Sequence, residues 1–263
     1  MKIISILSSG RKNGNTAHFA TEIESELQEI GKIYETPMVF ERIRLSELNL
    51  KFCCGCRLCF DKGEGCCLLT DDLLAIRDKI SQADGIILGS PVYVEDVNGI
   101  MKNWIDRMAF NSHRPAFAGK AAIVITTSGG GSTMHAANTM ATALNTWGFQ
   151  VAGKTKFRAG SNILEHEIKT RYDRKIKQTA KKLFDSIQSQ SVGCSSFNSL
   201  MFFKVQQKHW QKNTPKQETY DYRYWKNKGW IEPSCKYYTP LDTGHLKVMI
   251  ARLAGSLVAL FFV

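Results

Sequence analysis

Two short segments of this chain carry side chains that can do chemistry. The first is residues 8–16, Ser-Ser-Gly-Arg-Lys-Asn-Gly-Asn-Thr, which follows an apolar run and precedes a helical pattern. A loop of this kind aims backbone N–H groups and the positive end of a helix dipole at one point, which suits an anion. Hydroxyl groups add donors, Arg11 adds a fixed charge, and glycine lets the backbone approach a ligand closely. The spacing matches neither GxGxxG nor GxxxxGK[ST], so we expect the loop to hold a single phosphate monoester.

The second segment is a dense group of cysteines, namely Cys53, Cys54, Cys56, Cys59, Cys66 and Cys67. The N-terminus runs straight into an apolar strand pattern without the features of a signal peptide, so we expect a reducing, cytoplasmic compartment. In such a compartment a dense cysteine group indicates metal or redox chemistry before a disulfide framework.

Three states of this cysteine group stay open. Closely spaced Cys-x-x-Cys pairs let several sulfurs converge on an iron–sulfur cluster, zinc also accepts four thiolates, and the thiols can stay free of metal. Cys54 is spare in any four-ligand set. Cys194 and Cys235 are isolated in the sequence, and we expect them to be structural.

Short apolar runs alternate with longer helical patterns up to about residue 190, and this predicts the elements that must position both segments. Near-continuous apolar runs such as residues 121–125 are typical of parallel strands covered on both faces. Five successive β–α units predict a doubly wound α/β sheet, in which ligands bind beyond the carboxyl ends of the strands. We predict strands at 2–8, 38–45, 84–90, 120–127 and 149–157, and helices at 15–30, 70–82, 97–110, 132–147 and 166–188.

Three loops should therefore meet at one edge of the sheet. They are the loop from Ser9 to Thr16, the segment Ser90-Pro91-Val92-Tyr93, and the loop from Thr126 to Ser132. Each is rich in hydroxyl, glycine or proline residues. We interpret this edge as the ligand site.

The chain changes character after about residue 190. Residues 1–149 hold 15 Lys/Arg and 16 Asp/Glu, a net of −1, whereas residues 150–263 hold 20 and 8, a net of +12. We predict a domain over 1–188 and, over 189–263, an aromatic, basic, mostly helical extension that ends in an apolar helix. The uninterrupted apolar part, 253–263, is too short to span a bilayer. It either packs on the domain or a second subunit, or lies on a membrane surface as an amphipathic helix.

The chain resembles the NADPH-dependent FMN reductase group of the flavodoxin-like superfamily, and within it the iron–sulfur flavoproteins. The likeness rests on four features in order over residues 1–160: the loop 9–16, the cysteine group followed by Asp71-Asp72, the segment from Gly89 to Arg107, and the loop 127–131. It implies a flavodoxin-like sheet of order 2-1-3-4-5. The opening Ser8-Ser9-Gly10-Arg11 departs modestly from the family's usual Gly-Ser-Pro-Arg.

The resemblance also implies which residues bind the cofactors. Those that would hold the FMN phosphate are Ser9, Arg11, Asn15 and Thr16. Those that would lie along the flavin ring are Pro91, Val92 and Tyr93, with Thr127, Ser128, Gly129 and Gly130 closing the other side. A [4Fe–4S] cluster would take Cys53, Cys56, Cys59 and Cys67, because Cys67 fits the register to Asp71 better than Cys66 does.

No Ser–His–Asp set and no metal-ligand spacing of histidines is evident, so we assign no catalytic side chain and leave the chemistry to the cofactor. Lys102, Asp106 and Arg107 are expected to form an ion network on a helix surface. The resemblance implies hydride transfer from NAD(P)H to FMN. Electrons would then pass to a quinone, a nitro compound, free flavin or an iron–sulfur cluster.

Two alternatives remain. One is an electron-transfer flavoprotein reduced by a protein such as ferredoxin, an acidic partner that the basic extension would suit. The other is a non-enzymatic flavin- or metal-binding sensor whose basic tail docks on a membrane or a nucleic acid, with nucleic acid the least favoured partner. The resemblance further implies a homodimer or homotetramer, with the aromatic extension packed over the site or across the interface.

Overall fold

A five-stranded parallel sheet forms the centre of this computed structural model, which describes residues 1–161, 163–189, 196–212, 218–241 and 243–262. The strands are β1 (Lys2–Leu7), β2 (Val39–Arg44), β3 (Gly85–Tyr93), β5 (Ala121–Ser128) and β6 (Gln150–Arg158), in the order β2-β1-β3-β5-β6. A two-residue strand, β4 (Asp96–Val97), pairs antiparallel with the end of β3. The predicted doubly wound, flavodoxin-like topology is confirmed, with β4 added to it.

Apolar residues explain why β1, β3 and β5 occupy the middle of the sheet. Most of their side chains are fully buried, and all eight residues of β5 are buried. Both edge strands, β2 and β6, carry charged and exposed residues. Apolar central strands and more polar edge strands are typical of a parallel sheet that is covered on both faces.

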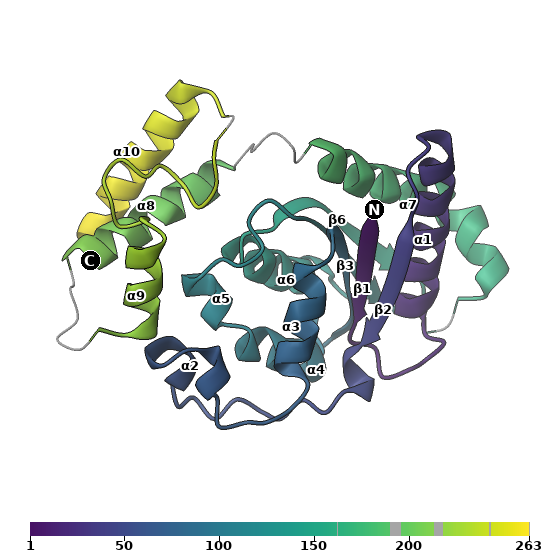
Figure 1. Ribbon diagram of the computed structural model, residues 1–263. Helices are drawn as coiled ribbons and strands as arrows, with labels where there is room; N and C mark the ends of the chain where they lie inside the picture. Colours follow the sequence, from purple (N-terminus) through teal and green to yellow (C-terminus); the bar gives the residue numbers. More distant parts are fainter. Residues whose placement is uncertain (162, 190–195, 213–217, 242, 263) are drawn as a thin grey trace.

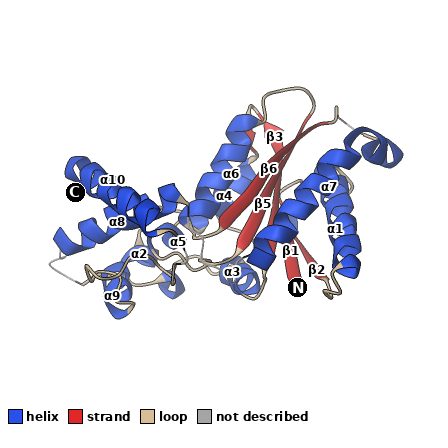
Figure 2. Ribbon diagram, turned by 90° about the horizontal axis from the view of Figure 1, so that it is seen from above, coloured by secondary structure: helices blue, strands red, loops and turns tan. Residues whose placement is uncertain are grey.

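Helices cover the two faces of the sheet (Figures 1 and 2). On one face, α1 (Asn15–Ile33) and α7 (Glu165–Ser189) pack together over a core that includes Phe19 and Phe157, whose rings stack with centroids 3.8 Å apart. On the other face lie α3 (Leu73–Ser81), α4 (Gly99–Arg107) and α6 (Met134–Thr146), around Trp104 and Trp147. Burial of these apolar faces is the main driving force for the layered fold.

Short elements connect the strands and the longer helices, and two of them contain Cys59 and Cys66. They are the 3₁₀ helices η1 (Leu45–Glu47) and η2 (Glu64–Cys66), and the single-turn helices α2 (Leu58–Asp61) and α5 (Phe110–His113). The predicted helix over 97–110 is therefore shorter, as α4, and is followed by α5.

The extension is helical, as predicted: α8 (Phe197–Lys212), α9 (Tyr220–Asn227) and α10 (His245–Phe262). It has its own core, in which Phe203 stacks on Trp225. Its α9 lies beside α2 of the cysteine segment, and α10 packs along α8 at the end of the molecule remote from α1 and α7 (Figure 1). The division into two domains at residue 189 stays a prediction. Among the described residues no helix is long and apolar enough to cross a membrane.

Candidate functional site

The loop after β1 ends in a helix start that suits an anion. Gly14 is the N-cap of α1, no side chain caps this end by a hydrogen bond, and no acidic residue lies in the first turn. The backbone N–H groups of a first helical turn have no partner within the helix, and the dipole gives this end positive character. The N-terminus of α1 therefore presents donors and positive potential toward the edge of the sheet, which is the arrangement predicted for a phosphate.

Two side-chain contacts join the segment 8–16 to the carboxyl ends of β3 and β5. The buried hydroxyls of Thr16 and Thr127 are 2.7 Å apart, and the Ser8 hydroxyl donates to the Ser90 hydroxyl at 3.1 Å. The predicted convergence of the three loops is confirmed by these contacts. It follows from the parallel pairing of β1, β3 and β5, which brings their carboxyl ends to one edge.

A tight hairpin carries the predicted flavin-ring segment. Its two turn residues, Val94 and Glu95, have φ of 49° and 65°, and Val94 is fully exposed. Two-residue hairpin turns of this kind favour Asn and Gly, so a β-branched residue here stores backbone strain. Tyr93, next to this turn, is 56% exposed and is free of core packing. Strain of this kind gathers at sites that position a ligand.

Hydrogen bonds of two residues that the sequence analysis did not identify hold the hairpin in place. Asn98 caps α4, accepting from the Met101 N–H at 3.2 Å, and its amide donates to the Ser8 carbonyl at 2.7 Å. The Glu95 carboxylate accepts from the Ser132 N–H at 3.4 Å. An Asn placed just before a helix start is a recognisable N-cap signal and could have identified Asn98.

A fourth loop, after β6, also joins the site. The Asn15 amide donates to the Gly160 carbonyl at 3.0 Å and its oxygen accepts from the Ile163 N–H at 3.2 Å. The Arg11 guanidinium donates to the Ser161 carbonyl at 3.1 and 3.2 Å. Both side chains, expected at the phosphate, hold two loops together in this structure. Their role as phosphate ligands stays a prediction, as do those of Ser9 and Thr16.

The remaining predicted flavin residues line the same edge. Thr127 and Ser128 are buried at the end of β5, Pro91 and Val92 are half-buried, and Gly129 and Gly130 are exposed. A Cβ added at Gly130 would meet nothing within 4 Å, so the space beside this glycine is open. These positions are compatible with a planar ring between the two loops. Their contacts with a flavin stay predictions.

The cysteine group forms a second centre, around a cavity of about 170 Å³. Five cysteines line it, with Phe60 and Phe110 among the apolar residues: Cys53, Cys54, Cys56, Cys59 and Cys67. Cys66 is exposed, as are Cys53 and Cys56, so the choice of Cys67 as the fourth ligand stays a prediction. Burial raises the pKa of the Cys59 thiol, with Arg114 opposing and Cys67 and Cys53 adding to the rise.

The cysteines that line the cavity are suitable metal ligands by their chemistry, but their positions in this structure do not form a metal site. Four of the lining residues are the predicted thiolate ligands, and their chemistry fits iron–sulfur or zinc binding. In the part of the chain that the structure describes, however, no three His, Cys, Asp or Glu side chains converge closely enough to hold a metal ion. The cysteine segment therefore offers suitable donors that are not assembled into a ligand sphere here.

Behind this cavity lies a buried ion pair. Arg107 and Asp71 side chains are 2% and 1% exposed, with Nη1 2.5 Å from Oδ2 and Nη2 3.1 Å from Oδ1. Arg107 also donates to the Lys51 carbonyl at 2.7 Å and lies 4.0 Å from Cys67 Sγ. The expectation of a surface network is correct for Lys102 and Asp106, whose pair is half-exposed, but wrong for Arg107. A pattern of i,i+4 charges could not reveal that Arg107 faces inward to a distant aspartate.

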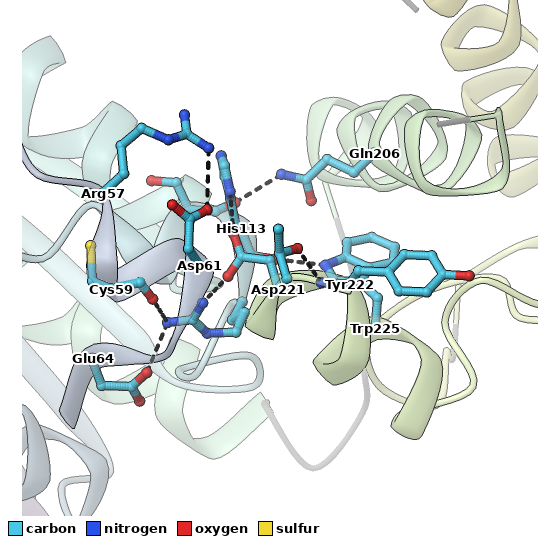
Figure 3. A network of polar contacts seen from close by, with 12 residues as sticks. Arg57, Cys59, Asp61, Glu64, His113, Gln206, Asp221, Tyr222 and Trp225 are labelled. Carbon is cyan, nitrogen blue, oxygen red and sulfur yellow. Dashed lines mark hydrogen bonds and ion pairs between the residues drawn. The ribbon is translucent and has the colours of Figure 1, made fainter. Parts of the chain in front are cut away.

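Arg114 connects the cysteine segment to the extension. Figure 3 shows Cys59 and Glu64 of the first lying near Asp221 of the second. Its side chain is 3% exposed; it donates to the Cys59 carbonyl at 3.0 Å and the Glu64 carboxylate at 2.8 Å, and it pairs with buried Asp221 of α9. Trp225 strengthens the junction by donating its indole N–H to the His113 carbonyl at 2.7 Å. The aromatic extension thus packs beside the cysteine segment.

Comparison with known proteins identifies the class that this fold and these loops define. The model of the NADPH-dependent FMN reductase family matches residues 1–162. The chain belongs to this family of FMN-binding flavin oxidoreductases, and its fold is flavodoxin-like.

The chain is also similar to individual proteins of known sequence or structure. An iron–sulfur flavoprotein of Archaeoglobus fulgidus is 31% identical over 232 residues, which cover 88% of this chain and 100% of that protein. An iron–sulfur flavoprotein of Clostridioides difficile is 29% identical over 188 residues, covering 72% of this chain and 80% of the relative. A solved structure of RosB with a bound intermediate, 8-demethyl-8-formylriboflavin-5'-phosphate, superposes with a TM-score of 0.58 at 11% identity, over 83% of this chain and 90% of that one. That last likeness is one of fold.

Proposed function

We propose that this protein is an FMN-dependent NAD(P)H oxidoreductase that passes electrons to a small acceptor or to an iron–sulfur cluster in its cysteine segment. One observation carries the proposal. No side chain caps the N-terminus of α1, and the Thr16–Thr127 and Ser8–Ser90 contacts hold it and the loop before it against the carboxyl ends of β5 and β3. A preorganised anion site beside two open loops is what a flavin with a single phosphate requires.

The chain's own part is to bind and orient the cofactor. Bound FMN would supply the redox chemistry, which is acceptance of hydride from a nicotinamide and release of electrons to an acceptor. The α1 N-terminus would hold the phosphate, the hairpin at Tyr93 would lie along the ring, and Gly129 and Gly130 leave room on the other side. The contacts of Asn98 and Glu95 fix the hairpin before any ligand arrives. No side chain need act as an acid or base.

The cysteine segment would hold the cluster through Cys53, Cys56, Cys59 and Cys67. A cluster carries single electrons, and its potential depends on charge and burial around the sulfurs. Arg107 beside Cys67 and Arg114 beside Cys59 place two buried ion pairs at this position, the first with Asp71 and the second with Glu64 and Asp221. Zinc or free thiols remain the alternatives for these residues.

A ferredoxin-like protein donor is the second candidate, and the basic extension favours it. Residues 189–263 hold 10 Lys/Arg and 4 Asp/Glu, a net of +6, and the extension lies directly beside the cysteine segment. Complementary charge speeds the encounter with an acidic partner. The non-enzymatic sensor has no such contact in its favour.

Anaerobic reduction of the FMN-loaded protein tests the proposal. We expect NADPH or NADH to bleach the flavin absorbance faster than reduced ferredoxin does. Tyr93→Ala should slow reduction, because it removes the exposed ring beside the flavin, whereas Arg11→Gln should weaken FMN binding without changing the rate at saturating FMN. Reduction by ferredoxin alone would support the second candidate, and failure of all three donors would contradict both.

Iron and acid-labile sulfide measured on anaerobically purified protein test the cluster separately. Iron and sulfide near four each per chain would support [4Fe–4S]. Zinc, or no metal, would assign the cysteines to one of the alternatives. We further propose a cytoplasmic location and a homodimer or homotetramer; light scattering that gives a monomer would contradict the latter.

A further inference from the structure

Helix α10 has small residues on its inner face and large apolar residues on its exposed face. Its inner face, which packs against α8, carries small or medium residues such as Ala251, Gly255 and Ala259. A Cβ at Gly255 would come within 2.6 Å of the Met201 carbonyl, so the two helices approach closely. The large apolar side chains of α10 point the other way.

These outward residues form one continuous stripe, which we call the α10 stripe. Spacings of three and four place residues on the same face of a helix. The stripe consists of Leu246, Met249, Ile250, Leu253, Leu257, Leu260 and Phe261, with exposed fractions from 47% to 84%. Monomeric proteins rarely expose contiguous apolar patches larger than a few hundred Å², so this stripe marks a surface that something covers.

Cations border the α10 stripe. Lys208 and Lys212 of α8 line a groove with Leu257 and Leu260, and Lys236 lines another with Met249. Neither α8 nor α10 contains an aspartate or glutamate. A second copy docked through this face would bring more lysines to it and no acidic partner from these helices, so the charge favours an anionic occupant.

We propose that the α10 stripe docks the protein on the surface of an anionic lipid bilayer. An apolar helix face bordered by lysines lies in the interface with its side chains about 5–10 Å deep, while the lysines meet anionic headgroups. Helix α10 lies at the end of the molecule opposite α1 (Figure 1), and the exposed stripe is on the side of α10 that does not pack against α8. Docking there leaves the flavin loops and the cysteine cavity outside the interface. The proposal stands independently of the oxidoreductase function.

Sedimentation of the full-length, FMN-loaded protein with vesicles tests it. We expect binding to vesicles of phosphatidylcholine mixed with phosphatidylglycerol, weakening as salt is added, and much weaker binding to phosphatidylcholine alone. Lys208→Gln should weaken binding about fivefold, since a lysine near an anionic surface contributes about 1 kcal/mol. Leu253→Gln should weaken it about tenfold or more.

A control variant distinguishes docking through the α10 stripe from nonspecific adsorption to vesicles. Ile33 is 75% exposed at the end of α1, far from the stripe, so Ile33→Gln should bind as the unaltered protein does. FMN binding should be unchanged in all three variants, which would show that they fold. Equal binding to both vesicle types, or none, would overturn the proposal. So would dimers in light scattering that Leu253→Gln dissociates without any vesicle binding, because a second copy would then cover the stripe.

Discussion

Breaking the buried pair of Asp71 and Arg107 should be among the most destabilising single changes near the cysteine cavity. Asp71→Ala leaves the Arg107 guanidinium in a site where it is 2% exposed, and also removes the acceptor for the Lys51 N–H at 2.9 Å. Removing one partner of a buried pair costs about 3–5 kcal/mol. Asp106→Ala, at the residue before Arg107 on α4, breaks an exposed pair with Lys102 and should cost under about 1 kcal/mol.

Urea unfolding of the two variants measures this difference as a shift in midpoint at constant slope. The pH dependence gives a second readout. Burial opposes ionisation of Asp71, but hydrogen bonds from Arg107, Lys51 and Leu73 outweigh it and lower the pKa of the carboxyl. A lowered folded pKa means that the stabilisation is present above the unfolded value of about 3.9 and is lost as pH falls through the folded one.

The gap between unaltered protein and Asp71→Ala should therefore be constant near neutral pH and close below about pH 4. Asp106→Ala should show no comparable closing. If Asp71→Ala cost no more than Asp106→Ala at neutral pH, the reasoning that this pair is buried and uncompensated would be refuted.

Three further changes test other parts of the molecule. Val94→Asn should raise the free energy of unfolding by about 1 kcal/mol, because asparagine tolerates the positive φ of this fully exposed position better than valine does. Val39→Asn in an edge strand should lower the free energy of unfolding. Thermal melts compare the two variants, and a lower melting temperature for Val94→Asn would contradict backbone strain at this turn. Thr16→Val removes a buried hydroxyl contact between the start of α1 and the end of β5 and should cost about 1–2 kcal/mol and weaken FMN binding, as fluorescence quenching would measure. Unchanged affinity would show that this contact does not support the site. Asp221→Asn removes the negative charge of the extension that pairs with Arg114, so it should loosen the cysteine segment and speed the reaction of its thiols with a thiol reagent. An unchanged rate would mean that the extension does not hold the cysteine segment.

The sheet and its helices could be predicted because their sequence signals are local. Buried runs such as Ile86–Leu88 and the alternation of strand and helix fix the topology, and the predicted strand order matches the structure. The edge where the loops meet follows from parallel pairing alone. Boundaries were less exact, because the turn before α5 carries no strong break in the pattern.

Long-range polar partners could not be predicted in this way. Arg107 and Asp71 are far apart in sequence, as are Arg114 and Asp221, and single residues of common types carry no signal of their pairing. The role of Asn15 as a link to Gly160 is of the same kind. Such contacts depend on how the elements pack, and only the three-dimensional structure shows them.

Comparing the affinities of FMN and riboflavin tests the central claim most directly, because the two ligands differ only in the phosphate that the N-terminus of α1 would hold. We predict that FMN binds at least about a hundredfold more tightly, since hydrogen bonds to a charged group contribute about 1.5–3 kcal/mol each and at least two backbone donors are available. The difference should shrink in Arg11→Gln. Equal affinity for the two flavins would contradict the account, because the phosphate would then not lie at α1.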